Sequence, residues 1–558
     1  MKKIHLILLS LLSGLLLFAS WPPKGFPFLI FFAFIPLFFV SDFLVRKPSK
    51  MPFWSGVGYS YIAFFVWNVS TTWWIWNSTP EGAIATFVLN SFFMSLVYGA
   101  WQRLCTLRLP VWCKIVAFIS FWCSWEYLHL NWDLTWPWLN LGNVFADVPE
   151  YIQWYEYTGT FGGTIWILLS NFLFFNLLKN IRETNSQRVL WAVVSILWIV
   201  LPAGLSLVRY HTYTLPELTE EESVEAIVIQ QNMEVWEEEY SWTNEEHTQR
   251  LIAIAKPLLT PRTRIMLCSE SAIPHTIFAK QLQMKDFPPF NTSYSGFLLL
   301  DTLLQQYPGL NIITGLSTVD IFNYKATETC RDMGDHIHMD FHNTSACYNR
   351  HGLRSLYYKS KLVPGVEKMP YPKIFGFLEK LAIDLGGISG SLGEDTAQRV
   401  FHLEQMKSPI GVPICYESAY GEHFGEFVRN GAEIMAVITN DSWWGDTPGH
   451  QQHYLFSKMR AVETRHPILR AANSGISAFI DERGDAHQVT QYDTQIAFKV
   501  NVCPSKKLTF YTKKGDYLAR IALSLTIAIL FLDIIMRLRS RVQSLRHPFN
   551  SANKEEQN

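Results

Sequence analysis

The sequence predicts a polytopic α-helical membrane domain joined to an α/β domain outside the membrane. The chain has 558 residues, and its mean hydropathy of +0.08 averages two unlike parts. Residues 1–208 are apolar and poor in charge, whereas residues 209–517 have the composition of a soluble domain. A last apolar stretch, 518–536, precedes a polar tail, 537–558. We therefore expect a transmembrane domain, an α/β domain, a final transmembrane helix and a tail.

Eight apolar runs come near the length of about 20 residues that lets a helix span a bilayer. They are residues 4–20, 26–45, 53–75, 83–101, 111–130, 162–178, 189–208 and 518–536. The first run can also be read as a cleavable signal peptide, because Lys2 and Lys3 precede it. We favour an uncleaved anchor, because further apolar runs follow at once. The prediction is seven spanning helices before the polar domain and one after it.

Lys and Arg gather in alternate loops between these runs. The basic residues after the second, fourth, sixth and eighth runs are Arg46, Lys47, Lys50, Arg103, Arg108, Lys114, Lys179, Arg182, Arg188, Arg537, Arg539, Arg541 and Arg546. The long loop 126–163 has neither Lys nor Arg. Because basic loops stay on the cytoplasmic side, the pattern predicts that both termini are cytoplasmic and that the 209–517 domain lies on the opposite side.

Charge and cysteine content argue against several other functions. The net charge of −1 offers no concentrated basic surface, so a nucleic-acid partner is not expected. The eight cysteines form no CxxC pair and no Cys/His cluster with metal-ligand spacing. Cys330 and Cys347 could pair in an oxidising compartment, but their spacing does not decide this. We expect no metal and no cofactor.

Short apolar strands alternate with helical stretches in the polar domain, which is typical of a layered α/β fold. The expected strands are residues 225–229, 264–268, 311–315, 409–414, 434–438 and 476–480, with a helix over 243–259. Polar residues follow most of these strands directly. In α/β folds the carboxyl ends of strands are where sites collect.

Three such segments carry chemistry that is complementary. Glu270 follows the 264–268 strand, Lys359 lies in the segment 357–364, and Cys415 ends the 409–414 run. In acyl transfer a thiol can attack a carbonyl, a carboxylate can take and return the proton, and an ammonium can stabilise the oxyanion. Each residue alone has an ordinary alternative, a solvated charge or a buried core cysteine.

The residues around these three resemble the nitrilase superfamily of carbon–nitrogen hydrolases and, more narrowly, the apolipoprotein N-acyltransferase family. The resemblance covers nearly the whole chain. Its motifs are Trp136–Leu139, Glu270–Pro274, Tyr358–Pro364 followed by Glu367, Ile414–Glu417, Thr439–Gly445, Met459–Glu463 running on to Arg470, Asn473–Ile476 and Thr509–Tyr511. Two positions depart from the family pattern. Cys268-Ser269 stand where a Trp-Pro pair is common, and Gly365-Val366 replace an aromatic residue and Gly.

The resemblance implies a four-layer αββα domain, a catalytic Glu270–Lys359–Cys415 triad and supporting roles for three further residues, Glu367, Tyr416 and Glu417. It also implies an acyltransferase of the bacterial inner membrane with its catalytic domain in the periplasm. A fatty acyl chain would pass from a phospholipid, through a Cys415 thioester, to the α-amine of a diacylglyceryl-cysteine apolipoprotein. Neither a metal nor a nucleotide is implied.

Alternatives remain at each level. Glu367 could merely cap the turn after Pro364, and Tyr416 and Glu417 could only pack and orient the thiol. The whole protein could be a membrane-tethered amidase acting on a small amide, since water and an amine use the same thioester. It could also be a transporter or scaffold whose outer domain only binds, although charges within the predicted helices are few.

For two further sets of residues, one charged and one of tryptophans, we favour a structural role over a functional one. Arg460, Glu463 and Arg470 are expected on one helix, where a spacing of three allows an ion pair between the first two. Trp132, Trp136 and Trp138 lie in the 126–163 loop. They are expected to form an interfacial aromatic belt, and the alternative is that they shape an entrance for lipid.

Overall fold

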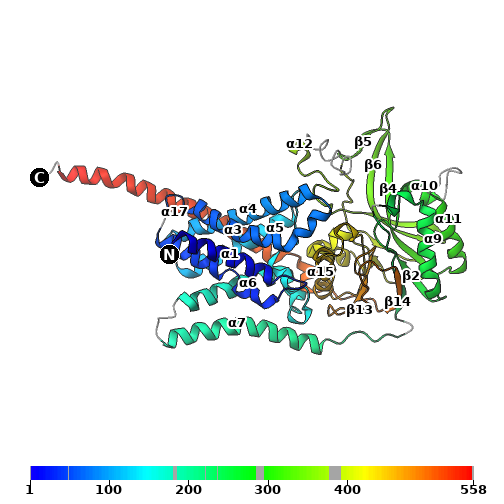
Figure 1. Cartoon of the computed structure of the whole chain (residues 1–558), viewed down its shortest axis with the longest axis horizontal. Coiled ribbons are helices and arrows are strands. Elements are labelled where there is room, and N and C mark those ends of the chain that lie inside the picture. The colour runs from blue at the N-terminus through cyan, green and yellow to red at the C-terminus, as the bar shows by residue number, and fades with distance from the viewer. Residues whose placement is uncertain are drawn as a thin grey trace.

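A bundle of helices adjoins an α/β domain along the long axis of the molecule (Figure 1). This computed structural model describes residues 2–47, 49–179, 185–219, 222–235, 237–284, 294–375 and 391–555. The chain builds the bundle first, then the α/β domain, and helix α17 then passes back along the bundle (Figure 1). Both termini lie at the end of the molecule that is remote from the α/β domain.

Each of the eight predicted apolar runs is helical in the structure. The helices are α1 (Lys3–Ala19), α2 (Ile35–Arg46, preceded by a 3-10 turn at Pro27–Phe32), α3 (Pro52–Thr72), α4 (Pro80–Cys105), α5 (Val111–Leu130), α6 (Tyr155–Lys179), α7 (Asn185–Thr212) and α17 (Tyr517–Glu555). Helix α17 continues past residue 536, so the described part of the predicted tail is helical as well.

Five helical segments within the described residues are long and apolar enough to cross a membrane. They are Pro27–Arg46, Pro80–Cys105, Tyr155–Lys179, Gln187–Thr212 and Tyr517–Arg539. Helix α1 is apolar but shorter. Helix α3 includes Asn68 and Thr72, and α5 includes Lys114 and Glu126, which reduce the mean hydropathy of both. The chain is therefore a membrane protein by helix length and composition, and the count of eight crossings stays a prediction.

Two β-sheets form the centre of the α/β domain. The first has the order β14–β1–β2–β4–β6–β5, with β3 beside β4 and β7 beside β6; the second has the order β13–β12–β11–β10–β9–β8. The strands of the first sheet are β1 (Val224–Gln230), β2 (Thr263–Leu267), β3 (Ile273–Phe278), β4 (Asn311–Phe322), β5 (Arg331–Asp332), β6 (His338–Asn349), β7 (Gly352–Tyr358) and β14 (Ile496–Val502). Those of the second are β8 (Val400–Phe401), β9 (Ile410–Gly411), β10 (Ile434–Thr439), β11 (Ile468–Ala472), β12 (Ala478–Ile480) and β13 (Ala486–His487).

Successive side chains of strand β1 point to opposite faces of the first sheet, and this explains how the layers stack. Ala226 and Val228 belong to the core that the first sheet shares with the second. Ile227 and Ile229 point to the opposite face, into a separate core with helices α9 (Asn244–Ala255) and α11 (Ser295–Gln306). Helices α14 (Gly421–Arg429) and α15 (Pro448–Thr464) flank the second sheet. The predicted layered α/β domain is thus confirmed, with helices on both outer faces of a two-sheet centre. The remaining short helices are α8 (Glu238–Ser241), α10 (Ala279–Met284), α12 (Pro372–Phe375) and α16 (Phe510–Lys514).

Two local predictions were wrong, and proline explains both. The run before Cys415 forms ladder pairs only at Ile410–Gly411, because Pro413 has no N–H to donate. Only an isolated bridge joins Ile414 to the second sheet. The helix expected to carry Arg470 ends at Thr464, where Arg465 adopts a left-handed conformation with φ 55°. Pro467 then precedes strand β11, which carries Arg470.

Candidate active site

A buried lysine links two of the predicted catalytic segments. Lys359 follows strand β7 and is only 1% exposed. Its Nζ donates to Glu270 Oε1 at 3.1 Å and to Glu367 Oε1 at 2.9 Å. Burial lowers the pKa of Lys359, but the charges of Glu270, Glu367 and Cys415 outweigh burial and raise it well above its ordinary value. The side chain therefore provides a fixed cation between two carboxylates.

Glu270 is held in one orientation by bonds to both of its carboxylate oxygens. Oε1 accepts from Asn343 Nδ2 at 2.7 Å as well as from Lys359, and Oε2 accepts the backbone N–H of Asn440 at 2.8 Å. Strand β4 passes so close that a Cβ on Gly315 would lie 2.6 Å from Glu270 Cα. Only glycine fits there, so the backbone of β4 helps to fix the carboxylate.

Cys415 sits at a sharp turn where the extended chain enters the 3-10 helix Cys415–Ala419. Its φ of 50° is unusual for a residue other than glycine. The carbonyl of Cys415 accepts from Ser418 Oγ at 2.8 Å and lies 3.0 Å from His453 Nε2. These contacts hold the strained turn. Burial, and next the charge of Glu270, raise the pKa of the Cys415 thiol, while Lys359 opposes them. The resting group is a neutral thiol.

Glu367 contacts both the turn at Pro364 and the buried Lys359. Its Oε2 accepts the backbone N–H of Val363 at 2.9 Å, which caps the turn after Pro364. Its Oε1 binds Lys359 and also accepts from Asn343 Nδ2 at 3.1 Å. Asn343 thus joins both carboxylates, and the sequence did not single it out, because within a strand such as β6 it carries no motif.

Glu417 lies beneath the turn and is completely buried. Its Oε1 accepts from Tyr357 OH at 2.6 Å and from the backbone N–H of Ser360 at 2.8 Å, and its Oε2 accepts the N–H of Ile414 at 2.7 Å. Burial raises the pKa of Glu417, but the neighbouring His423 and these hydrogen bonds hold it below its usual range. The carboxylate therefore ties the segment that carries Lys359 to the turn that carries Cys415.

Tyr416 connects the same turn to the helical bundle. Its hydroxyl donates to the carbonyl of Thr135 at 2.8 Å, and its ring stacks against Trp138 at 6.1 Å between centroids. Gln452 adds a second connection, because its Oε1 accepts the indole N–H groups of Trp74 and Trp138 at 3.2 and 3.1 Å. The turn that carries Cys415 is thereby held against the helical bundle.

Three buried side chains behind Cys415 (His453, Asp441 and Arg470) contact one another in a row that was not identified from the sequence. His453 lies 2.8 Å from Asp441, and Arg470 donates to the same carboxylate at 2.7 Å. Burial raises the pKa of Asp441, but His453 and Arg470 bring it well below its usual range. The thiol of Cys415, Asp441 and His453 have donor atoms within 4.8 Å of one another, a spacing that could also hold a metal ion. In the structure the Asp441 and His453 atoms bond to protein groups instead.

The predicted Arg460–Glu463 pair is present at 3.0 Å and fully buried.

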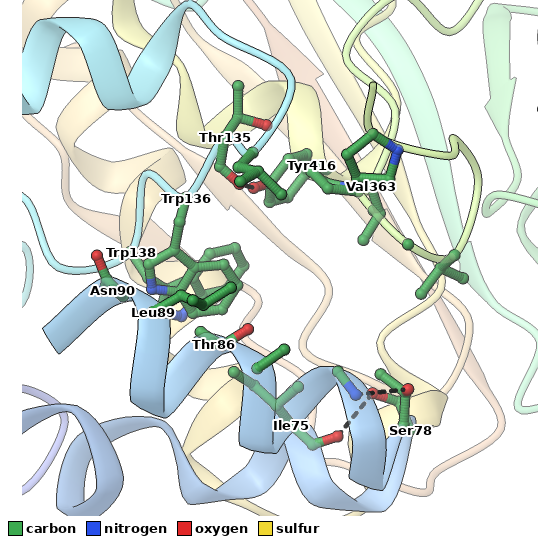
Figure 2. A pocket seen from close by; sticks show the side chains of 18 of the residues that line it. Ile75, Ser78, Thr86, Leu89, Asn90, Thr135, Trp136, Trp138, Val363 and Tyr416 are labelled. Carbon is green, nitrogen blue, oxygen red and sulfur yellow. Dashed lines mark hydrogen bonds between the residues drawn. The ribbon is translucent and has the colours of Figure 1, made fainter. Parts of the chain in front are cut away.

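An apolar cavity of about 280 Å³ opens beside Cys415. Figure 2 shows that its lining comes from both parts of the protein. The bundle supplies Ile75, Ser78, Thr86, Leu89, Asn90, Thr135, Trp136 and Trp138, and the α/β domain supplies Val363, Cys415 and Tyr416. Trp136 and Trp138 are therefore wall residues of a cavity. Trp132 packs instead against Phe93 and Trp125.

The eight cysteines, Cys330 and Cys347 included, are free thiols.

Comparison with known proteins gives matches over both parts of the chain. Residues 13–173 match the apolipoprotein N-acyltransferase N-terminal domain, and residues 312–495, which include Lys359 and Cys415, match the carbon–nitrogen hydrolase domain. Apolipoprotein N-acyltransferase of Chlorobaculum tepidum is 25% identical over 93% of this chain and 94% of its own length. The protein of that name from Haemophilus influenzae is 25% identical over 92% of both chains. Nit3 of Saccharomyces cerevisiae, a solved nitrilase-superfamily structure, is 15% identical with a TM-score of 0.35, over 54% of this chain and 96% of its own. Both domain families match in the same order along the chain, and the relatives align with it over nearly their full length. The chain therefore belongs to the apolipoprotein N-acyltransferase family of the carbon–nitrogen hydrolase superfamily.

Proposed function

We propose that this membrane enzyme moves a fatty acyl chain from a phospholipid to the N-terminal α-amine of a diacylglyceryl-cysteine apolipoprotein. The observation that carries the proposal is the apolar cavity at Cys415. Its wall includes residues of helix α4 and of the tryptophan loop, the part of the 126–163 loop that carries Trp136 and Trp138. An acyl chain that enters from the bilayer would bury its methylene groups there, at about 0.8 kcal/mol each. A small soluble amide would gain nothing from such a wall, which argues against the amidase alternative.

In the first half-reaction Glu270 takes the thiol proton while Cys415 Sγ attacks the ester carbonyl of the phospholipid. Lys359, which bonds to Glu270 and interacts electrostatically with the thiol, would stabilise the negative charge on the carbonyl oxygen. The C–O bond then breaks, and Glu270 returns the proton to the departing lysophospholipid. The product is a thioester on Cys415.

In the second half-reaction the acceptor amine attacks the thioester carbonyl. A C–N bond forms and the C–S bond breaks, and Glu270 carries the amine proton to the departing thiolate. The enzyme returns to its starting state with a neutral thiol. Positioning of the domain against the bilayer lets both lipid substrates arrive by lateral diffusion.

We further propose that the α/β domain faces the periplasm and that both termini are cytoplasmic. The alternation of basic loops supports this orientation. Both termini lie at the end of the bundle opposite the α/β domain (Figure 1), as an odd number of crossings before that domain requires.

Mass spectrometry of the purified full-length protein with phospholipid tests the function directly. We expect the peptide that contains Cys415 to gain the mass of a fatty acyl group, with release of lysophospholipid. Hydroxylamine should remove the added mass, because it cleaves thioesters, and a diacylglyceryl-cysteinyl peptide should remove it with formation of an amide. If acyl mass never appears at Cys415 while acceptor is being acylated, the thioester route is wrong.

The shape of the cavity predicts how chain-length preference can be changed. Thr86 lies on α4 and lines the cavity, so Thr86→Trp should shorten the space for an acyl chain. Each methylene that no longer fits should reduce the transfer rate of a long chain about fourfold relative to a short one. Competition between donors of different chain length measures this ratio. Ile84→Trp is the control, because Ile84 is on the same helix, is 52% exposed and does not line the cavity. An unchanged ratio in Thr86→Trp would place the acyl chain elsewhere.

A further inference from the structure

A second cavity lies on the Glu270 side of the active site and differs in character from the first. It has a volume of about 440 Å³, and polar and charged side chains, Arg331 and His342 among them, line it together with apolar ones such as Phe341 and Leu392. Those used here are Glu239, Glu270, Asn343, Glu367 and Asn440. Val366 lines both cavities, so the loop from Val363 to Glu367 separates an apolar space from a polar one. Two chemically different substrates could thus reach the catalytic groups from two sides.

Among the carboxylates of the polar cavity, Glu239 is unlike the other two. Glu270 and Glu367 have both oxygens in hydrogen bonds, to Lys359 and Asn343 on one side and to backbone N–H groups on the other. Glu239, on α8, is 8% exposed, and its Oε2 is buried with no hydrogen-bond partner among the described residues. A buried carboxylate oxygen without a partner is costly. Its position in the wall of a cavity leaves this carboxyl accessible to a donor on a bound ligand.

The electrostatics of this carboxyl fit a cationic amine. Burial, and next the charge of Glu270, raise the pKa of Glu239 to about 7. An α-amino group has a pKa of about 7.7–8.0. A proton can therefore move between the two groups at little cost, whereas a surface carboxylate would be much too weak a base.

We propose that Glu239 binds the α-ammonium of the acceptor lipoprotein in the polar cavity and takes its first proton. The inference deepens the proposed function and rests on it. The ammonium gives one proton to the Glu239 carboxylate and becomes a neutral amine, and the carboxylate becomes a carboxylic acid. The amine nitrogen then attacks the thioester, and Glu270 moves the second proton to the Cys415 sulfur. Glu239 releases its proton to water through the cavity before the next acceptor arrives.

Glu239→Gln tests this role in the full-length enzyme with the two half-reactions measured separately. We expect Cys415 to be acylated by phospholipid within about twofold of the wild-type rate, since the donor does not use Glu239. The concentration of diacylglyceryl-cysteinyl peptide that half-saturates decay of the acyl-enzyme should rise about tenfold or more, because a charge-assisted hydrogen bond is lost. Glu238→Gln is the matched control: it is the preceding residue, its carboxylate pairs with Arg250 at 2.6 Å, and it should leave both steps unchanged.

An acceptor analogue supplies a test that does not depend on folding of a variant. A diacylglyceryl-cysteinyl peptide with an acetylated amine has no positive charge, so it should compete with the free-amine peptide at least about tenfold less well on the wild-type enzyme. In Glu239→Gln this discrimination should largely vanish. Equal competition on the wild type, or wild-type decay kinetics in Glu239→Gln, overturns the assignment of Glu239. Neither result bears on whether Cys415 is acylated, whereas an enzyme that never carries acyl mass would refute the proposed function itself.

Discussion

Replacement of Glu270 by Gln should slow the formation of the Cys415 thioester by about 10²- to 10⁴-fold, the usual contribution of a general base. The amide has almost the same size as the carboxylate but cannot take a proton. Because burial and Glu270 raise the pKa of the Cys415 thiol, little thiolate exists at neutral pH. The base must therefore act during the attack itself.

One effect of this substitution works in the opposite direction. The negative charge of Glu270 is among the causes that raise the thiol pKa, so its removal lowers that pKa somewhat. Burial is the larger cause and is unchanged, so most of the thiol remains protonated and the loss of the base dominates. The pH dependence separates the two effects. Below the thiol pKa, the thiolate fraction rises tenfold for each pH unit, so the acylation rate of Glu270→Gln should climb steadily as the pH increases.

Single-turnover measurement of lysophospholipid release gives the rate for each protein. Glu394→Gln is a suitable control, because Glu394 forms a half-exposed ion pair with Lys368 at 2.9 Å and should affect neither rate nor stability appreciably. Thermal unfolding shows whether Glu270→Gln remains folded. Acylation at the wild-type rate in a folded Glu270→Gln protein would show that another group accepts the thiol proton.

The candidate catalytic residues could be picked out from the sequence because each lies in its own motif beside a short apolar run. Glu270, Lys359 and Cys415 are far apart in the sequence, yet Lys359 bonds to Glu270, and both interact electrostatically with Cys415. Asn343, in contrast, stands in the middle of β6, where a polar residue is unremarkable. Its role depends on which side of the sheet faces Glu270 and Glu367, which no local pattern reveals.

Long-range packing also explains what the sequence did not predict. The cavity at Cys415 exists because the tryptophan loop and α4 meet the turn that carries Cys415. Hydropathy shows that the α4 residues are apolar, but it does not tell whether they face lipid, a helix or a cavity. Glu239 lies in an acidic stretch that resembles a solvated surface. Only the folded arrangement buries its carboxylate beside Glu270.

Replacement of Lys359 by Met should nearly abolish transfer and also destabilise the α/β domain. The methionine fills a similar volume but leaves Glu270 and Glu367 without their shared cation in a buried site. Removal of one partner of a buried ion pair costs about 3–5 kcal/mol. The reaction loses the charge that stabilises the oxyanion, a loss of about 10²- to 10³-fold. Lys359 also opposes the rise in the thiol pKa, so the thiol becomes still harder to deprotonate.

A double substitution distinguishes the stability effect from the catalytic one. In Lys359→Met with Glu367→Gln, one unpaired carboxylate has been removed, so the free energy of unfolding should recover by at least about 1 kcal/mol. Transfer should remain as low as in Lys359→Met alone, because the cation is still missing from the reaction. Thermal unfolding and single-turnover acylation measure the two quantities on the same samples. If activity returned together with stability, Lys359 would serve only to neutralise the two carboxylates, and the oxyanion would have to be stabilised by backbone N–H groups near Cys415.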